Sequence, residues 1–159
     1  MRFYAHIAFG FFLSGFIISD WSPVLFSLVL FFSVLPDIDY PYSFIGSMFP
    51  SISKFLFKKF GHRGLIHSIY IPVSLVVDFF LFNNYIALVV GLVFTSHIVL
   101  DMFTKSGVQL LNPLNYSFVL LDGDLETNSL KHNLLVTTFS LAGFIVWLLY
   151  KEWLIGLIW

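Results

Sequence analysis

Cysteine is absent from the 159-residue sequence, and charged residues make up only 11% of it. The absence of cysteine excludes disulfides and thiolate metal ligands, and it leaves the redox compartment undetermined. Soluble domains are about 25% charged and about 45–50% apolar, whereas this sequence is 58% apolar and contains 21 Phe. So few polar side chains cannot cover a water-facing surface. The composition therefore excludes a soluble globular domain, and its high hydrophobicity excludes disorder.

Basic residues show no excess over acidic ones, and the sequence contains no internal repeat. The sequence contains eight Lys or Arg and nine Asp or Glu, which gives a net charge of −1. The sequence therefore lacks the excess of basic residues that is typical of a nucleic-acid-binding protein. The length suggests one domain. We therefore expect residues 1–159 to form a single integral-membrane domain, with no nucleic-acid partner.

Five apolar stretches are candidate membrane helices, since a spanning helix needs about 20 apolar residues. They cover residues 3–19, 23–35, 64–82, 85–103 and 134–150. The second is short and is expected to tilt or to be buried. A cleaved signal peptide is the alternative for the first, but no small-x-small cleavage site follows it. The predicted fold class is all-α, a polytopic membrane bundle of about five transmembrane helices.

The distribution of Lys and Arg predicts the orientation of this bundle. Basic residues precede the first stretch and occur in the loops 36–63 and 104–133, but none occurs in the turns 20–22 and 83–84. Positive loops stay on the cytoplasmic side. We therefore expect the amino terminus and both long loops to face the cytoplasm from the plasma (inner) membrane. Lys54, Lys58 and Lys59, interleaved with Phe, predict an interfacial helix that binds anionic lipid headgroups.

Ionisable side chains gather at the helix ends predicted to lie on the cytoplasmic side, although such groups are costly in a membrane. His97 and Asp101 share one helix face because they are four residues apart. At 1.5 Å of rise per residue, the whole set lies within about 10 Å of one depth. The candidate metal ligands are His6, Asp37, Asp39, His62, His67, His97 and Asp101.

Imidazole and carboxylate together predict a site for a divalent metal, with zinc or manganese favoured and iron also suited. Seven candidate ligands exceed the four of a tetrahedral ion, so two ions with a bridging ligand are one option. A bound metal can lower the pKa of water to about 7, which allows hydrolysis without a Ser or Cys nucleophile. Taken singly, each residue has a plainer explanation: His6 as an interhelical hydrogen-bonding group, Asp37 and Asp39 as helix-end residues.

Several short motifs resemble those of the membrane-bound metal-dependent hydrolases typified by the LexA-regulated YdjM proteins of bacteria. The motifs are His6 in the first helix, Leu-Pro-Asp-Ile-Asp at 35–39, His-Arg-Gly-x-x-His-Ser at 62–68 and His-x-x-x-Asp at 97–101, followed by Thr104, Gly107 and Asn-Pro at 112–113. They extend over about two thirds of the chain, although Ile66 stands where the family usually has Thr. The resemblance implies a hydrolase and implies no particular substrate.

We therefore expect a metal-dependent hydrolase that cleaves a phosphoester or phosphodiester of a lipid or lipid-linked substrate. Arg63 is expected to stabilise the phosphoryl oxygens, with an inside-facing charge anchor as its alternative role. One of the catalytic candidates Asp37, Asp39 and Asp101 would act as a base. An amide or an ester is the alternative class of substrate.

Two other functions compete with the hydrolase. A metal transporter would need ligands across the membrane, where only Asp20 and Asp78 are available. A structural or assembly protein would use the polar cluster to hold helices together without metal.

Overall fold

The computed structural model describes residues 2–114, 116–120 and 129–158, with the side chains of 152–158 excepted. Regular structure in these ranges is helical, apart from isolated bridge residues such as the pair Val108 and Phe118. The all-α fold class is therefore confirmed. The helices are α1 (Phe3–Gly15), α2 (Pro23–Val34), α3 (Phe44–Met48), α4 (Pro50–Phe60), α5 (Tyr70–Phe82), α6 (Tyr85–Met102) and α7 (Leu130–Ile158), with two 3₁₀ turns, η1 (Leu35–Asp39) and η2 (Leu65–His67).

Local signals in the sequence explain where the helices begin and end. Ser22 caps α2, because its side chain accepts a hydrogen bond from the Leu25 N–H, and Pro23 occupies the first turn, where a missing N–H costs nothing. Asn83 ends α5 in the left-handed conformation, and the Asn84 side chain caps α6. The two asparagines therefore make the tight turn between α5 and α6 that the sequence predicts.

Helix length separates the five apolar helices into two groups. Residues 85–102 in α6 and 130–151 in α7 are long and apolar enough to cross a membrane. Helices α1, α2 and α5 contain 13, 12 and 13 residues, or about 18–20 Å, against a hydrocarbon core of about 30 Å. The described chain thus has two candidate spanning helices, and the prediction of five spans is not confirmed.

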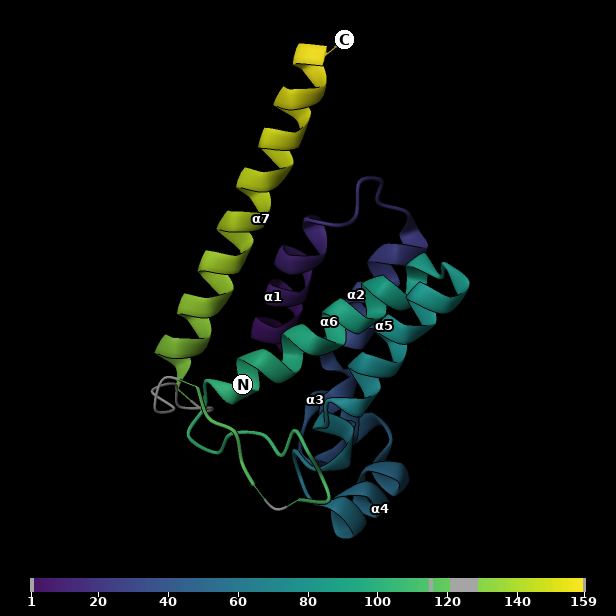
Figure 1. The fold of residues 1–159 in the computed structure, drawn as a ribbon. Coiled ribbons are helices and arrows are strands. Elements are labelled where there is room, and N and C mark those ends of the chain that lie inside the picture. Colours follow the sequence, from purple (N-terminus) through teal and green to yellow (C-terminus); the bar gives the residue numbers. More distant parts are fainter. Residues whose placement is uncertain (1, 115, 121–128, 159) are drawn as a thin grey trace.

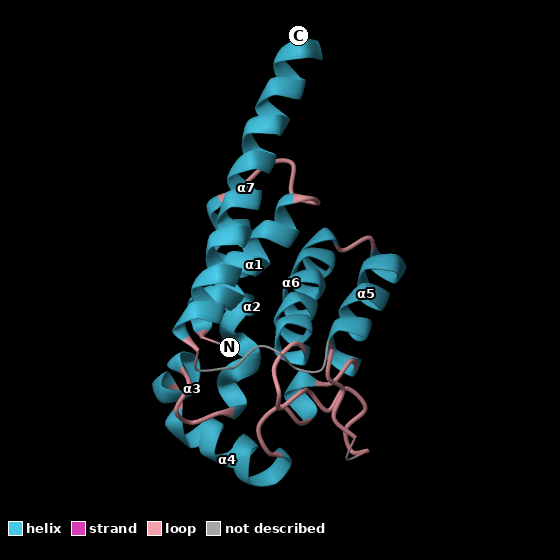
Figure 2. Ribbon diagram, turned by 90° about the vertical axis from the view of Figure 1, so that its left-hand side faces the viewer, coloured by secondary structure: helices cyan, strands magenta, loops and turns pink. Residues whose placement is uncertain are grey.

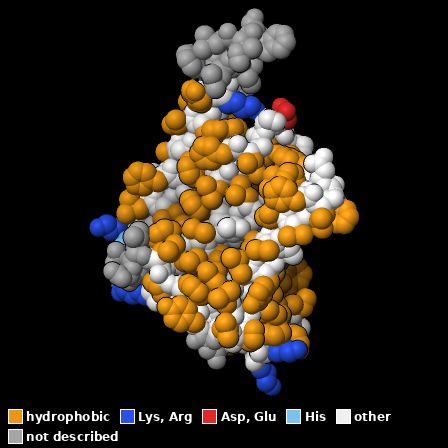
Figure 3. Space-filling model, viewed as in Figure 1, with side chains coloured by type: hydrophobic (Ala, Val, Ile, Leu, Met, Phe, Trp, Pro, Cys, Tyr) orange, Lys and Arg blue, Asp and Glu red, His pale blue; other side chains and the backbone are white. Residues whose placement is uncertain are grey.

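Helix α6 is the central element of the bundle. It packs against α1, α2 and α5, while α1 also contacts α2 and α7 (Figures 1 and 2). Most of α6 is buried, whereas α7 is mainly exposed over residues 130–151, and α7 extends past the other helices. Hydrophobic side chains cover most of the face in Figure 3, and Lys and Arg lie near its borders. This surface is the expected one for a protein solvated by lipid.

Helices α3 and α4 lie beside η1, at the end of the bundle where α2 stops. Helix α4 exposes Lys54, Lys58 and Lys59 together with Phe55 and Phe57. The stretch predicted to form an interfacial helix is therefore helical and amphipathic. Its binding to anionic headgroups stays a prediction.

Close approach of α1 to α2 and α6 depends on Gly10. A Cβ at this position would collide with the Ser33 Oγ and lie 3.5 Å from a methyl group of Val93. We expect Gly10→Val to destabilise the protein by about 1–3 kcal/mol, the usual cost of overpacking a core. Denaturant unfolding in detergent micelles would measure this loss. Ser27→Leu, a comparable enlargement on the exposed face of α2, should change stability little, and equal effects would contradict this packing role for Gly10.

Candidate metal centre

Pro36 turns two carboxylates into the bundle. Its ring lacks an N–H and clashes with the preceding helical turn, so α2 ends and the chain continues as the 3₁₀ turn η1. Asp37 and Asp39 in this turn are both buried. The Asp37 carbonyl accepts hydrogen bonds from the Tyr40 N–H and the Ser43 hydroxyl, which fix the turn.

A sharp bend after α4 brings η2 against η1. Gly61 and Arg63 both have positive φ, at 75° and 60°. At Gly64 a Cβ would collide with the Phe60 carbonyl oxygen, so the close approach requires glycine. The bend leaves His67 fully buried in η2. The sequence predicts a membrane helix from residue 64, whereas α5 begins at Tyr70, so His67 lies in the turn before that helix.

Four side chains from three separate segments converge on one point. Asp37, His67, His97 and Asp101 are all buried, and each offers one ligand atom within 4.8 Å of the others. The His97 Nε2 lies 3.6 Å from the Asp37 Oδ1 and 3.7 Å from the Asp101 Oδ2. The His67 Nε2 lies 3.6 Å from the Asp101 Oδ2. These four side chains are called the metal group below.

The spacing of the metal group fits a single ion. Two ligand atoms that are each about 2.1 Å from a tetrahedral ion lie about 3.4 Å apart, close to the 3.6–3.7 Å separations in the group. Direct hydrogen bonds would be shorter, at about 2.7–3.2 Å. Two buried carboxylates this close together also repel unless a cation neutralises them. The group could therefore hold a metal ion.

Hydrogen bonds at the Nδ1 atoms of His67 and His97 determine that the Nε2 atoms face the other members of the metal group. The His97 Nδ1 donates a hydrogen bond to the Ser33 carbonyl oxygen at 2.7 Å, and the His67 Nδ1 donates to the Asp39 Oδ2 at 2.9 Å. Each Nε2 is consequently left facing the metal group, buried and without a hydrogen-bond partner in the described structure. Buried polar atoms are rarely left without a hydrogen bond. The two Nε2 atoms lie where an ion in the metal group would need its ligands.

Asp39 lies behind the metal group and is not one of its members. Its Oδ1 accepts a hydrogen bond from the His62 Nδ1 at 2.8 Å, and its Oδ2 accepts from the His67 Nδ1 and from the Arg63 N–H. Burial raises the pKa of the Asp39 carboxyl, but His67 and His62 outweigh burial and hold that pKa below its ordinary value. Asp39, predicted as a ligand or a base, is therefore placed to orient His67, as carboxylates do behind metal-binding histidines.

Protonation of His67 follows from the same neighbours. Burial lowers the pKa of His67, but Asp39 and Asp101 outweigh burial and raise it to about 9. Metal binding at the Nε2 would therefore release a proton.

We expect Asp39→Ala to weaken metal affinity by about 10–100-fold, the usual cost of losing a group that orients a metal-binding histidine. Titration of the purified protein against a competing chelator would measure the affinity. Asp78→Ala, which removes a carboxylate from α5, is the matched control and should leave the affinity unchanged. An unchanged affinity in Asp39→Ala would mean that His67 needs no orienting carboxylate.

Arg63 pairs with the metal group from inside the protein. Its Nη2 lies 2.8 Å from the Asp101 Oδ1, and its Nη1 donates to the Thr104 hydroxyl, the Ser106 hydroxyl and the Gly107 carbonyl. The side chain is buried and both Nη atoms are engaged. Arg63 thus positions Asp101 and the segment after α6, while its Nε is buried without a hydrogen-bond partner in the described structure. Its predicted contact with a phosphate stays a prediction.

His6 and His62 flank the metal group on different sides. The His6 ring stacks on the His97 ring at 3.7 Å between centroids, and its Nε2 lies 3.5 Å from the Asp101 Oδ1. His62 is partly exposed, bonded to Asp39 and stacked on Tyr40. The four-residue group includes neither histidine, although the sequence predicts both as ligands.

A cavity of about 290 Å³, lined by aromatic and polar side chains, reaches Asp37. Besides Asp37 its wall contains Arg2, Tyr40, His62 and Arg63. We call this cavity the mouth. It gives the least buried member of the metal group, Asp37, access to a solute.

One functional contact lacks any signal in the sequence. The carbonyl of Ser33 that orients His97 belongs to the backbone of α2, and residue identity does not report such a contact. The sequence motifs include Thr104 and Gly107, but nothing in the sequence indicates that these residues and Ser106 accept hydrogen bonds from Arg63.

An apolar helical fold with a buried group of two histidines and two aspartates defines a membrane protein with a candidate metal centre. The chain matches the family described as "YdjM inner membrane protein" over residues 1–157, and it belongs to that family. The resemblance noted from the sequence motifs is confirmed in this respect. The family description names a location and no activity, so the hydrolase assignment is not supported by it.

Curated relatives give the same family. Inner membrane protein YdjM of Escherichia coli (strain K12) is 37% identical over 110 residues, which cover 64% of this chain and 55% of that protein. The protein of the same name from Shigella flexneri gives the same values. Uncharacterized protein YvsG of Bacillus subtilis (strain 168) is 32% identical over 118 residues, 70% of each chain. The chain spans about half the length of the YdjM proteins, whose names support an inner-membrane location. No solved structure gives a significant match.

Proposed function

We propose that this protein is a membrane-embedded, metal-dependent hydrolase that cleaves a phosphoester or phosphodiester of a lipid or lipid-linked substrate. The observation that carries the proposal is the metal group, whose four buried ligand atoms converge within 4.8 Å and whose member Asp37 lines the mouth. Two imidazoles and two carboxylates suit zinc or manganese. A bound divalent ion would supply an activated water at neutral pH.

One ion accounts for the residues better than two. The metal group forms one set of four ligand atoms. Asp39 and His62, which a second ion would need, are hydrogen-bonded to each other at 2.8 Å. We therefore propose a single ion held by His67, His97 and Asp101, with Asp37 beside the fourth coordination position, where water would bind.

Residues around the mouth supply the remaining functions. Asp37 is the member of the metal group that lines the mouth, so it is the carboxylate that a substrate would meet and the candidate for proton transfer. Arg63 is engaged with Asp101. The phosphate contact that the sequence assigned to Arg63 therefore falls to Arg2 and His62, which line the same cavity. The positive residues at this end, including those of α4, favour a mouth that faces the cytoplasm.

Transport is the weaker candidate. A carrier needs ligands along the membrane depth, and the part of the chain that the structure describes contains one candidate metal group, at one end of the bundle. A metal-free assembly factor is the other candidate, and it predicts no bound ion.

The test is metal analysis combined with a hydrolysis screen. Protein purified without chelator should contain close to one zinc or manganese ion per chain, and it should release product from at least one phospholipid or lipid-linked phosphate. Asp37→Asn should lower turnover by at least about 100-fold, and His132→Gln, a change outside the metal group, should not. Protein with no bound metal would exclude the enzyme, and full turnover by Asp37→Asn would exclude the proposed role of Asp37.

A further inference from the structure

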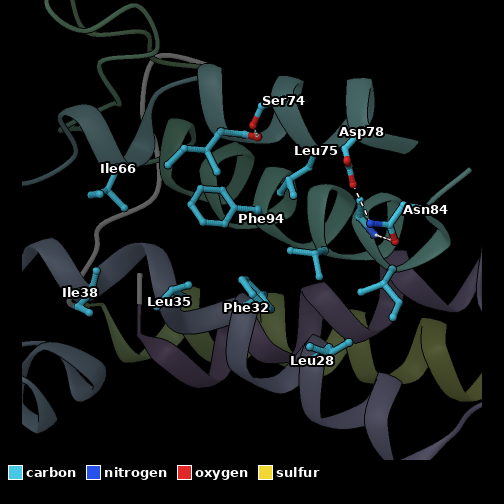
Figure 4. Close-up of a pocket in the computed structure, with 14 residues that line it drawn as sticks. Leu28, Phe32, Leu35, Ile38, Ile66, Ser74, Leu75, Asp78, Asn84 and Phe94 are labelled. Atoms are coloured by element: carbon cyan, nitrogen blue, oxygen red, sulfur yellow. Dashed lines mark hydrogen bonds between the residues drawn. The ribbon is translucent and has the colours of Figure 1, made fainter. Parts of the chain in front are cut away.

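A second cavity, of about 530 Å³, lies between α2, α5 and α6 (Figure 4). Leu28 and Phe32 on α2 and Leu35 at the start of η1 form one wall, while Leu75 and Phe94 face them from α5 and α6. None of its lining residues is Lys or Arg. We call this cavity the apolar groove.

The polar groups of the apolar groove lie toward one end and one edge. Asp78 and Asn84 are joined by a hydrogen bond of 2.7 Å at the turn between α5 and α6. Ser74 lines the groove from the exposed side of α5, and its hydroxyl is bonded to the Ile71 carbonyl. Between these points the lining is hydrocarbon, which matches a hydrocarbon ligand and not a polar one.

The other end of the groove adjoins the metal group. Ile38, which lines the groove, stands between Asp37 and Asp39 in η1, and Ile66 precedes His67 in η2. Figure 4 shows both isoleucines at the opposite end from Asp78 and Asn84. The same two turns therefore present apolar side chains to the groove and polar side chains to the metal group.

The dimensions of the groove match part of one leaflet. From Leu28 on α2 to Leu35 at the start of η1 the wall rises about 10 Å at 1.5 Å per residue. One leaflet contributes about 15 Å of hydrocarbon. A chain lying along α2 in this groove would run in the direction in which lipid chains run, with its polar end at η1 and η2.

We propose that the apolar groove binds one hydrocarbon chain of a membrane phospholipid and so places the polar linkage of that lipid at the metal group. The chain-binding site itself rests on the groove, whereas its role in orienting a scissile bond rests on the hydrolase function proposed above. Binding the remote chain would position the reacting linkage, which is how enzymes use contacts away from the chemistry.

The test uses phosphatidylglycerol with a diazirine on one palmitoyl chain, in vesicles of phosphatidylethanolamine and phosphatidylglycerol. After illumination, mass spectrometry locates the labelled residues. Labelling should concentrate on groove residues such as Phe32 and Leu75. Ser74→Trp and Leu28→Trp, which place a large ring on opposite walls, should each reduce groove labelling by about tenfold. Val73→Trp, the neighbouring exposed position on α5 outside the groove, should not.

The same labelling should persist in protein stripped of metal by a chelator, which separates this proposal from the hydrolase function. Groove labelling without any hydrolysis would support the chain-binding site even if the enzyme fails. Uniform labelling around the bundle would overturn the proposal, as would equal labelling in Ser74→Trp, Leu28→Trp and Val73→Trp. Crosslinks to a second copy of the chain in place of lipid at the groove would also overturn it.

Discussion

Replacing His97 by alanine is expected to reduce metal affinity by at least about 100-fold. Losing a group that merely orients a ligand costs about 10–100-fold, and His97 contributes a ligand atom directly. Its Nε2 is buried, faces Asp37 and Asp101, and has no hydrogen-bond partner in the described structure. Competition with a chelator and elemental analysis of the purified variant would measure the loss.

A second measurement separates metal binding from packing, because His97 also stacks on His6 and binds the Ser33 carbonyl. A ligand that binds only the folded state raises the melting temperature. Added zinc should therefore raise the melting temperature of the wild type and of His132→Ala, and leave that of His97→Ala unchanged. A zinc-dependent rise in His97→Ala that equals the wild type would remove His97 from the metal group.

Replacing Arg63 by methionine is expected to lower the free energy of unfolding by about 3–5 kcal/mol. Removing one partner of a buried ion pair leaves the other charge uncompensated, and this is the usual cost. Arg63 and Asp101 are both buried and lie 2.8 Å apart. The change also removes the donor to Thr104, Ser106 and Gly107. Denaturant titration of metal-stripped protein in micelles, followed by circular dichroism, would measure the difference.

Three further variants define the origin of that loss. Arg2→Met removes an exposed charge at the mouth and should change stability little. Arg63→Lys keeps the charge without the planar fork that reaches two sets of partners, so its stability should lie between those of Arg63→Met and the wild type. Arg63→Met combined with Asp101→Asn should recover part of the loss. If the double variant is less stable than Arg63→Met alone, the buried charge of Asp101 is not the cause.

Much of the helical framework is predictable from composition and periodicity. Long apolar runs locate all five apolar helices, and the bounds of α6 differ from the expected stretch by a single residue, 103. The shared face of His97 and Asp101 also follows from their spacing, because four residues complete about one turn. These features depend on neighbours in the chain, which the sequence reports directly.

The features that the sequence does not predict depend on distant partners. Leu65 and Ile66 are apolar, so nothing in their composition separates the turn η2 from the helix that follows it. Asp39 and Arg63 have the residue types of a ligand and a phosphate clamp. Their structural roles come from partners 23 to 44 positions away. The spacing of residues along the chain cannot show which of the seven candidate ligands belong to the metal group, because the contacts that distinguish them are tertiary.

The apolar groove has one further consequence for kinetics. Ser74 and Ile86 on its border are exposed, so the groove is open on the outer side of the bundle, from which a lipid of the proposed kind would enter. A ligand that enters this way arrives by two-dimensional diffusion, and its relevant concentration is its mole fraction in the bilayer. Diluting the substrate with inert lipid at constant total amount should then slow turnover, whereas diluting the vesicles in buffer should not.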